Sequence, residues 1–454
     1  MSIATVNPAT GKTEATYEPY DDGAVEERLA RADRVAALWR TTSFAERGRL
    51  MVGAAQLLEA ELPDTARMLV TEMGKTYSSA KGEIAKCAVA MRYFAEQAES
   101  MLADEPVLTK ASDSRVVYRP MGPVLAVMPW NFPMWQVTRF AAPAVMAGNV
   151  GLLKHASNVP QTALYLEDLF RRAGFPEGVF QTLLVGSERV EAIIADDRVR
   201  AVTLTGSEGA GRSVGAAAGR AIKKSVLELG GSDPFVVLPS ADLERAAAVG
   251  VEARVQNNGQ SCIAAKRFVV HEDVYDRFVE LFVQSTEELV VGDPMQPATS
   301  VGPLALDSGR TTIEEQVEDA RKLGAEVLCG GYALEGPGWY YRPTVLAGIS
   351  PSMRVDSEEV FGPVAMVYRA SDSDEALALA NASGFGLGAS VWSTDPDEQQ
   401  RFLEGIQAGL VFVNAMVASM PELPFGGLKR SGYGRELSAH GIREFCEIRT
   451  RWMS

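Results

Sequence analysis

The chain has 454 residues, more than one hydrophobic core usually organises, so we expect two or three domains. With 46% apolar and 23% charged residues, the composition is that of an ordinary globular protein and excludes a fibrous or disordered chain. The formal net charge of -15 disfavours nucleic acid as a partner, because affinity for a phosphate backbone is built from clustered lysines and arginines.

The N-terminus and the cysteine and histidine content narrow the class further. Residues 1–8 have no basic stretch followed by an apolar one, and no apolar run approaches about 18 residues, so we expect a cytoplasmic chain with no membrane contact. Three histidines without HExxH or CxxC spacing predict no metal site. Scattered cysteines predict reduced thiols, at Cys87, Cys262, Cys329 and Cys446.

The first hundred residues are expected to form a layer of helices. The sequence SFAE at residues 43–46 is a capping-box pattern, and apolar residues follow it at helical spacing, at Leu50, Ala54, Leu57 and Leu58. At residues 115–119 the pattern changes to RVVYR, which is β-prone and polar at its ends. We expect this segment to form an exposed or intersubunit strand.

From residue 124 onward, short apolar segments alternate with helical ones, as in βαβ units with a parallel sheet. The predicted strands of a first α/β domain are residues 124–127, 150–153, 180–185 and 201–204. A second α/β domain is expected from about residue 225 to 413, with strands at 235–238, 268–270 and 364–367. The glycine run at 384–388 is expected to be a bend, and residues 422–436 a loop or ordered connector.

Cys262 is the first candidate for a nucleophile. It follows the small and flexible residues Gly259 to Ser261, where the backbone can approach a ligand closely and a thiol can remain accessible. The alternative is a half-buried structural cysteine, and the local sequence does not exclude it.

Glu228 is a candidate general base. It lies between two leucines and ahead of a glycine pair, in LELGG at residues 227–231. Apolar surroundings raise the pKa of a carboxyl group toward neutrality, as a general base requires. A surface glutamate at a strand end is an equally good interpretation of this segment.

Asn131 lies in MPWNFP at residues 128–133, directly after an apolar strand, at the strand end where open α/β sheets bind ligands. Its amide is a candidate donor to an oxyanion, and Trp130 with two prolines indicates a rigid loop. An asparagine in such a place is otherwise a turn former.

The GxGxxG phosphate-binding pattern is absent, but TGSEGAG at residues 205–211 follows a predicted strand and opens a helical stretch. Free N–H groups at such a helix start bind anions, which makes Gly206 and Ser207 candidates for a phosphate site. Lys154, at the end of another strand, can reach a ribose or a phosphate; otherwise it is a solvated surface charge.

Together these segments make the chain resemble the aldehyde dehydrogenase superfamily over nearly its whole length. The motifs that carry the resemblance occur in the family's order: NPATG at 7–11, PWNFP at 129–133, TGS at 205–207, LELGG at 227–231, GQSC at 259–262, EVFGP at 359–363 and PFGG at 424–427. The resemblance implies an α/β fold with a Rossmann-like cofactor domain, an α/β catalytic domain and a small β extension for oligomerisation.

The resemblance also implies domain boundaries and an assembly. It places the cofactor-binding domain at residues 1–104 and 121–228 and the catalytic domain at 229–420. Oligomerisation strands and the C-terminal segment would occupy residues 105–120 and 432–454. A homodimer or homotetramer is implied, with the strand near Val116 and the segment near Ile448 at the interface.

Carried over residue by residue, the family's mechanism makes Cys262 the thiolate that attacks the aldehyde carbon. Asn131 and the backbone N–H of Cys262 would hold the oxyanion. Glu228 would activate the water that hydrolyses the resulting thioester. The product would be a carboxylic acid.

The same resemblance implies a nicotinamide cofactor. Glu359 would hold the nicotinamide ribose, with Phe361 beside the nicotinamide and Lys154 at the adenosine ribose. Trp130 and Gly206 are placed in the same site, and Ser207 would meet the pyrophosphate. NAD-preferring relatives tend to carry a glutamate three residues after this lysine, where Ser157 stands here, so we predict that NADP is preferred and NAD is weaker. His155 replaces the usual proline after the lysine.

Residues 134–139 and 259–267 look most like succinate-semialdehyde dehydrogenases. Arg139 is expected to pair with the distal carboxylate of a semialdehyde, because a planar guanidinium suits that contact. Ser261 and Ser419 would add hydrogen bonds, and Trp135 is placed in the same substrate site. The alternative for Arg139 is a structural ion pair. No second cysteine adjoins Cys262, which predicts no local redox switch.

Other functions stay open at this point. One alternative is an aldehyde dehydrogenase for another small aliphatic aldehyde, and the other is an esterase or thioesterase that uses Cys262 and Glu228 without nicotinamide. The esterase would turn over thioesters with no absorbance change at the reduced-cofactor band. A non-catalytic binding or structural role would be favoured by loss of the nucleophile or the base, and both are present.

Overall fold

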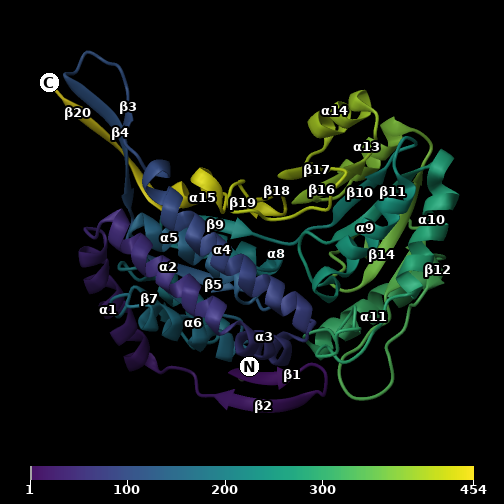
Figure 1. Cartoon of the computed structure of the whole chain (residues 1–454), viewed down its shortest axis with the longest axis horizontal. Coiled ribbons are helices and arrows are strands. Elements are labelled where there is room, and N and C mark those ends of the chain that lie inside the picture. The colour runs from purple at the N-terminus through teal and green to yellow at the C-terminus, as the bar shows by residue number, and fades with distance from the viewer. Residues whose placement is uncertain (1–2) are drawn as a thin grey trace.

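Two sheets covered by helices make up the body of the molecule, and a three-stranded arm projects from one side (Figure 1). The computed structural model describes residues 3–454. The chain begins in a small hairpin below the helices and ends at the tip of the arm (Figure 1). No helix within these residues is long and apolar enough to cross a membrane.

The predicted helical layer is present, but it begins only after residue 21. Its helices are α1 (Asp22–Trp39), α2 (Phe44–Ala60), α3 (Leu62–Met73) and α4 (Tyr77–Met101). Ser43 accepts a hydrogen bond from the backbone N–H of Glu46 and so caps α2 as the sequence predicted.

The prediction of helix was wrong for residues 3–17, which form an antiparallel hairpin of β1 (Ile3–Asn7) and β2 (Lys12–Tyr17). The turn between them ends at Gly11, whose φ of 70° favours glycine. Thr5 on β1 donates a 2.9 Å hydrogen bond to buried Glu72 of α3, so tertiary contacts hold the hairpin against the helical layer.

The first sheet contains the four strands predicted between residues 124 and 204. Its parallel strands are β5 (Pro123–Met128), β6 (Val150–His155), β7 (Phe180–Thr182), β8 (Ala201–Thr205) and β9 (Lys224–Glu228). They are connected through α5 (Trp135–Ala147), α6 (Pro160–Arg172), α7 (Val190–Ala195) and α8 (Glu208–Arg220).

The five parallel strands of this sheet have the order β7-β6-β5-β8-β9. The chain therefore winds outward in one direction from β5 and then returns to β8 on its other side. The loops after β5 and β8 separate at this reversal, which is where open α/β sheets bind dinucleotides. These loops carry Asn131 and Ser207.

The second sheet has the order β12-β13-β14-β11-β10-β16-β17 and is parallel except at β12. Its strands are β10 (Asp233–Val237), β11 (Ala265–His271), β12 (Glu326–Cys329), β13 (Thr344–Ala347), β14 (Val364–Ala370), β16 (Gly388–Trp392) and β17 (Leu410–Val413). The helices of this region are α9 (Leu243–Val255), α10 (Glu272–Glu287), α11 (Asp307–Lys322), α12 (Arg354–Ser357), α13 (Ser373–Asn381) and α14 (Pro396–Gly405).

The glycine run at 384–388, predicted to be a bend, instead contributes to two strands. Its first part, β15 (Phe385–Gly386), pairs with β18 (Leu428–Lys429), and Gly388 begins β16. A Cβ at Gly386 would lie 2.7 Å from the Gln407 carbonyl oxygen, and one at Gly388 would lie 2.5 Å from the Asp233 carboxylate. These glycines therefore serve close packing between strands.

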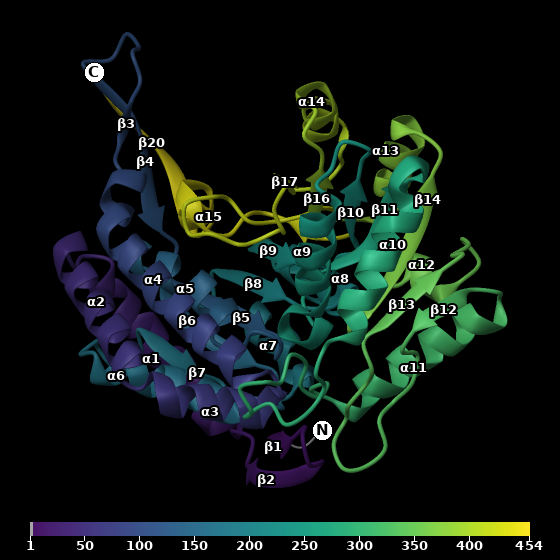
Figure 2. The same ribbon diagram turned by 45° about the vertical axis from the view of Figure 1, so that its right-hand side comes forward.

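The C-terminal segment crosses from the second sheet to the first and then enters the arm. Figure 2 shows the chain crossing from β17 to α15 (Ser438–Glu444) before it enters the arm. On the way, β19 (Gly432–Tyr433) pairs with β9 of the first sheet. The arm places β4 (Asp113–Pro120) between β3 (Glu105–Pro106) and β20 (Cys446–Met453).

Candidate active site

Cys262 lies in a loop whose backbone conformation is unusual. The loop follows η2 (Gln256–Gly259), where Asn257 and Asn258 have φ of 54° and 58° and Gly259 has φ of 77°. A Cβ at Gly259 would lie 2.4 Å from the carbonyl carbon of Gly362. Only glycine therefore allows the loop before Cys262 to pack this closely on the segment that contains Glu359 and Phe361.

Buried amide and ammonium groups hold this loop in place. Lys266 is fully buried on β11, and its Nζ donates to the carbonyl oxygens of Ser261 at 2.8 Å and Cys262 at 2.7 Å. Its Nζ is also 3.5 Å from Oε1 of Glu359. Lys266 thus connects the loop that bears the candidate nucleophile to the carboxylate predicted to hold a ribose.

Asn131 contacts the same loop from the other sheet. Its Nδ2 donates a 3.2 Å hydrogen bond to the Gln260 carbonyl oxygen, and Asn257 Nδ2 donates to the Asn131 carbonyl oxygen at 2.7 Å. A side-chain amide has two N–H donors, so Asn131 keeps one donor for a ligand beside Cys262.

Glu228 ends β9 and is 1% exposed, which excludes the surface glutamate that the sequence left open. Its pKa is raised to about 8, mainly by burial; nearby Glu436 contributes to the rise and Arg139 opposes it. Its Oε1 has no hydrogen-bond partner within residues 3–454. Near neutral pH a carboxyl group of this kind can both take and release a proton.

Arg139 on α5 is buried and already engaged. It forms an ion pair with Glu436, donates a 3.3 Å hydrogen bond to Thr205 Oγ1 and lies over the Phe425 ring at 4.3 Å. Its guanidinium is 4.0 Å from Glu228. This is the structural ion pair that the sequence left open as the alternative to a substrate contact.

The Cys262 thiol is protonated at neutral pH in the protein alone. Its pKa is raised to about 12, mainly by burial; the carboxylates of Glu228 and Glu359 contribute to the rise, while Arg139 and Lys266 oppose it. A thiolate is the reactive form of cysteine. Attack by Cys262 therefore requires a change in the site, such as the arrival of a positive charge or transfer of the proton to a base.

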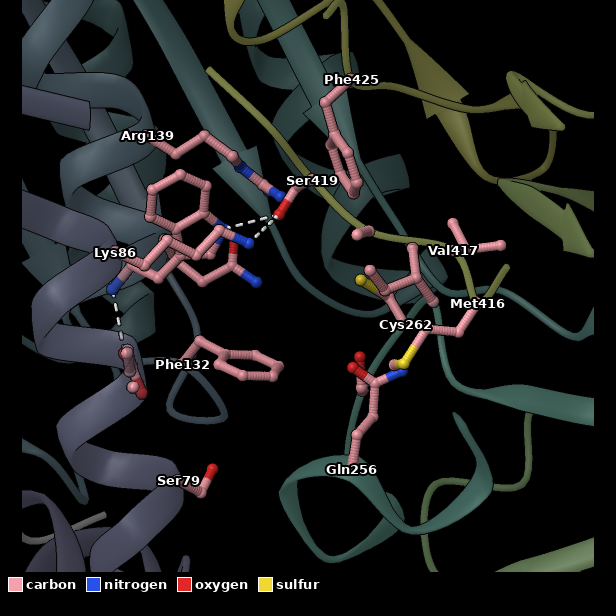
Figure 3. A pocket seen from close by; sticks show the side chains of 17 residues that line it. Ser79, Lys86, Phe132, Arg139, Gln256, Cys262, Met416, Val417, Ser419 and Phe425 are labelled. Atoms are coloured by element: carbon pink, nitrogen blue, oxygen red, sulfur yellow. Dashed lines mark hydrogen bonds between the residues drawn. The ribbon is translucent and has the colours of Figure 1, made fainter. Parts of the chain in front are cut away.

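Cys262 is a lining residue of two cavities. The first cavity, of about 220 Å³, is lined by the predicted substrate residues Trp135, Arg139, Ser261 and Ser419. The second, of about 270 Å³, is lined by the predicted cofactor residues Trp130, Gly206, Ser207, Glu359 and Phe361 and by Asn131. Figure 3 shows the first cavity, with Cys262 facing Lys86, Arg139 and Ser419.

The cofactor-side residues have the orientations that such a site needs. Ser207 caps α8 by accepting from the Ala210 N–H, so the positive end of this helix faces the cavity. Phe361 meets Trp130 edge to face, with ring centroids 5.7 Å apart. Glu359 accepts a 3.0 Å hydrogen bond from the Gly231 N–H.

Lys154 and Ser157 lie farther along the same sheet edge, at the end of β6 and in the loop after it. Lys154 is buried, which lowers its pKa, and its Nζ makes no ion pair or hydrogen bond within residues 3–454. Glu188 acts on this charge from a distance and opposes the lowering of the pKa, but no carboxylate of residues 3–454 lies within 4.0 Å of Nζ. A ligand phosphate would give Lys154 a direct partner.

His155 braces the loop that carries Asn131. Its Nε2 donates to the Pro133 carbonyl oxygen at 2.9 Å and its Nδ1 accepts from the Ala156 N–H at 2.9 Å. Burial lowers its pKa to about 4, so the ring is neutral. His155, which replaces the family's usual proline, therefore fixes the loop after β5 through hydrogen bonds.

Three residues of the site were not identified from the sequence: Lys86, Lys266 and Glu436. Lys86 belongs to a regular helix far from every motif, and its Nζ donates to Ser419 Oγ at 2.7 Å. Glu436 follows a glycine-rich connector that the sequence marked only as a loop or connector. Lys266 lies within residues 259–267, but the sequence predicted no role for it. No local sequence pattern distinguishes these three charged residues from charged residues on the protein surface.

All four cysteines are free, and within residues 3–454 no group of three or more histidine, cysteine, aspartate or glutamate side chains is arranged to hold a metal ion.

Comparison with known proteins identifies relatives over the full length. The aldehyde dehydrogenase family model matches residues 1–451. A Mycobacterium tuberculosis (strain H37Rv) protein named succinate-semialdehyde dehydrogenase NADP(+) 1 is 60% identical, covering 100% of both chains. A Mycobacterium avium (strain 104) protein named succinate-semialdehyde dehydrogenase NADP(+) is 59% identical, covering 100% of this chain and 97% of the relative.

Solved structures agree with these sequence matches. The crystal structure of succinic semialdehyde dehydrogenase from Streptococcus pyogenes in complex with NADP+ has a TM-score of 0.97 and 36% identity, covering 99% of each chain. A structure of an E. coli NADP-dependent enzyme has a TM-score of 0.96 and 35% identity, covering 99% of this chain and 94% of the other. The predicted α/β architecture is confirmed.

We predict that hydrolysis of an acyl group on Cys262 depends on Glu228 and accelerates as pH rises. With a pKa of about 8, Glu228 is mostly protonated at pH 6.5 and becomes a base only as pH passes 8, so the rate should rise between pH 6.5 and 9 and then level off. Glu228→Gln should slow hydrolysis by about 100-fold or more. The measurement is decay of the acyl-enzyme formed with p-nitrophenyl acetate, followed by mass spectrometry.

Glu252→Gln is the matched control, because Glu252 is exposed on α9. It should retain the rate and pH profile of the wild type. A Glu228→Gln enzyme with an unchanged profile would assign the base to another residue.

Proposed function

Because the chain belongs to the aldehyde dehydrogenase family, we propose that it oxidises succinic semialdehyde to succinate and reduces NADP in the same turnover. The single observation that carries this proposal is that the Cys262 thiol lines both cavities. One group can therefore hold an aldehyde carbon on one side while presenting it to a hydride acceptor on the other. The names of the 60% and 59% identical relatives support the choice of substrate and cofactor.

In the proposed mechanism, the Cys262 thiol releases its proton to solvent, and the resulting thiolate sulfur bonds to the aldehyde carbon. The carbonyl oxygen becomes an oxyanion, which the free N–H of Asn131 and the backbone N–H of Cys262 stabilise. The second cavity, lined by Ser207, Glu359 and Phe361, would hold the oxidised nicotinamide cofactor, which would supply the acceptor for the hydride of this carbon. The remaining thioester is attacked by water, Glu228 takes the water proton, and the C–S bond breaks to release succinate.

NADP fits the residues at the outer end of the cofactor site. Lys154 is a buried cation with no carboxylate oxygen of residues 3–454 within 4.0 Å, and Ser157 offers a neutral hydroxyl in the loop after β6. A 2'-phosphate would supply the missing negative charge for Lys154. A glutamate at residue 157 would instead accept from a free ribose 2'-hydroxyl and repel the phosphate.

Hydrolysis of esters or thioesters needs only an acyl group on Cys262 and its hydrolysis by water, so Cys262 and Glu228 could also catalyse that reaction. The second cavity distinguishes the two functions, because its capped helix, paired aromatic rings and ribose-directed carboxylate have no use in ester hydrolysis. We therefore propose the dehydrogenase as the main activity.

The proposed function is tested by NADP reduction with succinic semialdehyde and with pentanal, an uncharged aldehyde. The wild type should prefer succinic semialdehyde, and Cys262→Ala should lower its rate by about 1,000-fold or more because no covalent intermediate forms. Cys329→Ala, at a half-buried cysteine on β12, should behave as the wild type. Reduction with pentanal only would refute the substrate, and no reduction with any aldehyde would refute the dehydrogenase.

Cofactor choice is tested at residue 157. Ser157→Glu should lower kcat/KM for NADP by about 10- to 100-fold, because a carboxylate beside the 2'-phosphate repels it, and should lower kcat/KM for NAD much less. Ser157→Ala should weaken NADP only slightly. If both cofactors respond equally to Ser157→Glu, residue 157 does not contact the ribose.

We further propose that the arm assembles the chain into a homodimer or homotetramer. Strand β20 is an edge of the three-stranded sheet and exposes the apolar side chains of Ile448, Trp452 and Met453. An unpaired, apolar edge strand is a site for pairing with another chain. A second copy would cover both the backbone edge and these side chains.

Ile448→Asp should reduce the oligomer to a smaller species, because a charge at the strand edge opposes burial. Sedimentation velocity at micromolar concentration measures the change. Glu447→Asp, at the neighbouring residue, should retain the wild-type assembly. A wild type that sediments as a monomer would refute the proposed assembly.

A further inference from the structure

The loop that would meet the 2'-phosphate of NADP is held from outside by the hairpin at the start of the chain. Residues 156–159 connect β6 to α6 and include Ser157. The backbone N–H of Ala4 on β1 donates a 3.0 Å hydrogen bond to the Ser157 carbonyl oxygen. Strand β1 packs against both α3 and α6, below the helical layer (Figure 1). The hairpin therefore fixes the peptide group that directly follows the Ser157 side chain.

A second contact fixes the helix that follows this loop. Helix α6 begins at Pro160, and its N-cap residue, Val159, makes no side-chain cap hydrogen bond. The carboxylate of Glu72 on α3 takes that place, because Oε1 accepts from the Gln161 N–H at 2.8 Å and Oε2 accepts from the Thr162 N–H at 3.0 Å. Proline has no N–H, so Glu72 pairs with the N–H groups that the first turn of α6 leaves free.

Thr5 joins the hairpin to this cap. Its Oγ1 donates to Glu72 Oε1 at 2.9 Å and accepts from Gln161 Nε2 at 3.0 Å. Thr162 Oγ1 donates to Glu72 Oε2 at 2.7 Å, so each carboxylate oxygen accepts two hydrogen bonds. Thr5, Glu72 and Thr162 are all fully buried, where a polar group that loses its partner is costly. One carboxylate therefore ties β1, α3 and the start of α6 together.

The same cap decides which groups are left for a ligand. The N-terminus of a helix attracts anions through its free N–H groups, but at α6 the carboxylate of Glu72 already occupies them. Burial raises the pKa of Glu72, and the hydrogen bonds that it accepts oppose that rise. A phosphate at residues 156–159 would therefore depend on Lys154 and Ser157 rather than on the helix, and so on the position of their loop.

We propose that Thr5 and Glu72 are positioning residues for the cofactor, which hold the loop of residues 156–159 in the conformation that accepts the 2'-phosphate of NADP. This inference rests on the proposed contact of Ser157 with that phosphate. The Ser157 carbonyl oxygen, with its partial negative charge, is directed at Ala4. A released loop would let this peptide group turn toward the phosphate, and the repulsion would weaken binding of NADP more than binding of NAD.

The test measures binding of NADPH and NADH by fluorescence titration without aldehyde, so that no catalytic step enters. Thr5→Val removes both hydrogen bonds of the hydroxyl at nearly constant shape, and the dissociation constant for NADPH should rise by about 3- to 10-fold. The dissociation constant for NADH should change by less than about twofold. In turnover, KM for NADP should rise while kcat stays within about twofold of the wild type.

Glu72→Gln tests the cap itself. Both oxygens of Glu72 accept from N–H groups, so an amide nitrogen in either place would oppose a donor. The dissociation constant for NADPH should rise by about 10-fold or more, again with a smaller change for NADH. Thermal melting shows whether each variant is folded, and if Glu72→Gln does not melt cooperatively, Thr5→Val decides the question.

Thr16→Val is the matched control, because Thr16 is an exposed threonine on the other strand of the same hairpin. It should bind NADPH and NADH as the wild type does.

The outcomes separate this inference from the proposed function. If folded Thr5→Val binds NADPH within about twofold of the wild type, or loses affinity for NADPH and NADH equally, the positioning role is refuted and the proposed function stands. If the wild type binds NADPH no more tightly than NADH, the proposed contact of Ser157 with the 2'-phosphate is refuted, and the positioning role with it.

Discussion

The buried ion pair between Arg139 and Glu436 is the constraint on which the site depends. It joins α5 of the first sheet to the connector between β19 and α15, two segments almost 300 residues apart in the chain. Breaking a buried pair by removing one partner typically costs about 3–5 kcal/mol, so this contact holds the connector over the end of β9.

The two sheets contribute different parts of the chemistry. The first supplies the loops after β5 and β8, with an amide donor and a capped helix, at the reversal of its strand order. The second supplies the loop of Cys262, which Lys266 holds by two carbonyl oxygens while facing Glu359. Cys262, the proposed nucleophile, therefore lies where the two sheets meet and lines both cavities. Burial there raises the pKa values of both Cys262 and Glu228.

The sequence by itself determined the elements and the motifs that follow them. Alternation of apolar segments with helical ones predicted the α/β fold and seven strand positions, because a buried parallel strand must be continuously apolar. A capping pattern located the start of α2. These predictions needed only local properties: side-chain period and capping. The joint roles of Cys262, Glu228 and Asn131 were implied by the resemblance that the motifs carry in their fixed order, since the local pattern left an alternative open for each residue.

Tertiary structure alone decided which charges are free and which are paired. Nothing near Arg139 in the sequence reveals Glu436, and nothing near Lys86 reveals Ser419, because both contacts join segments about 300 residues apart. The initial hairpin and the strands of the glycine run were likewise missed, since their stability comes from Glu72 and from close strand packing. Ionic pairing depends on distance and burial in the folded chain, and neither is encoded in a local pattern.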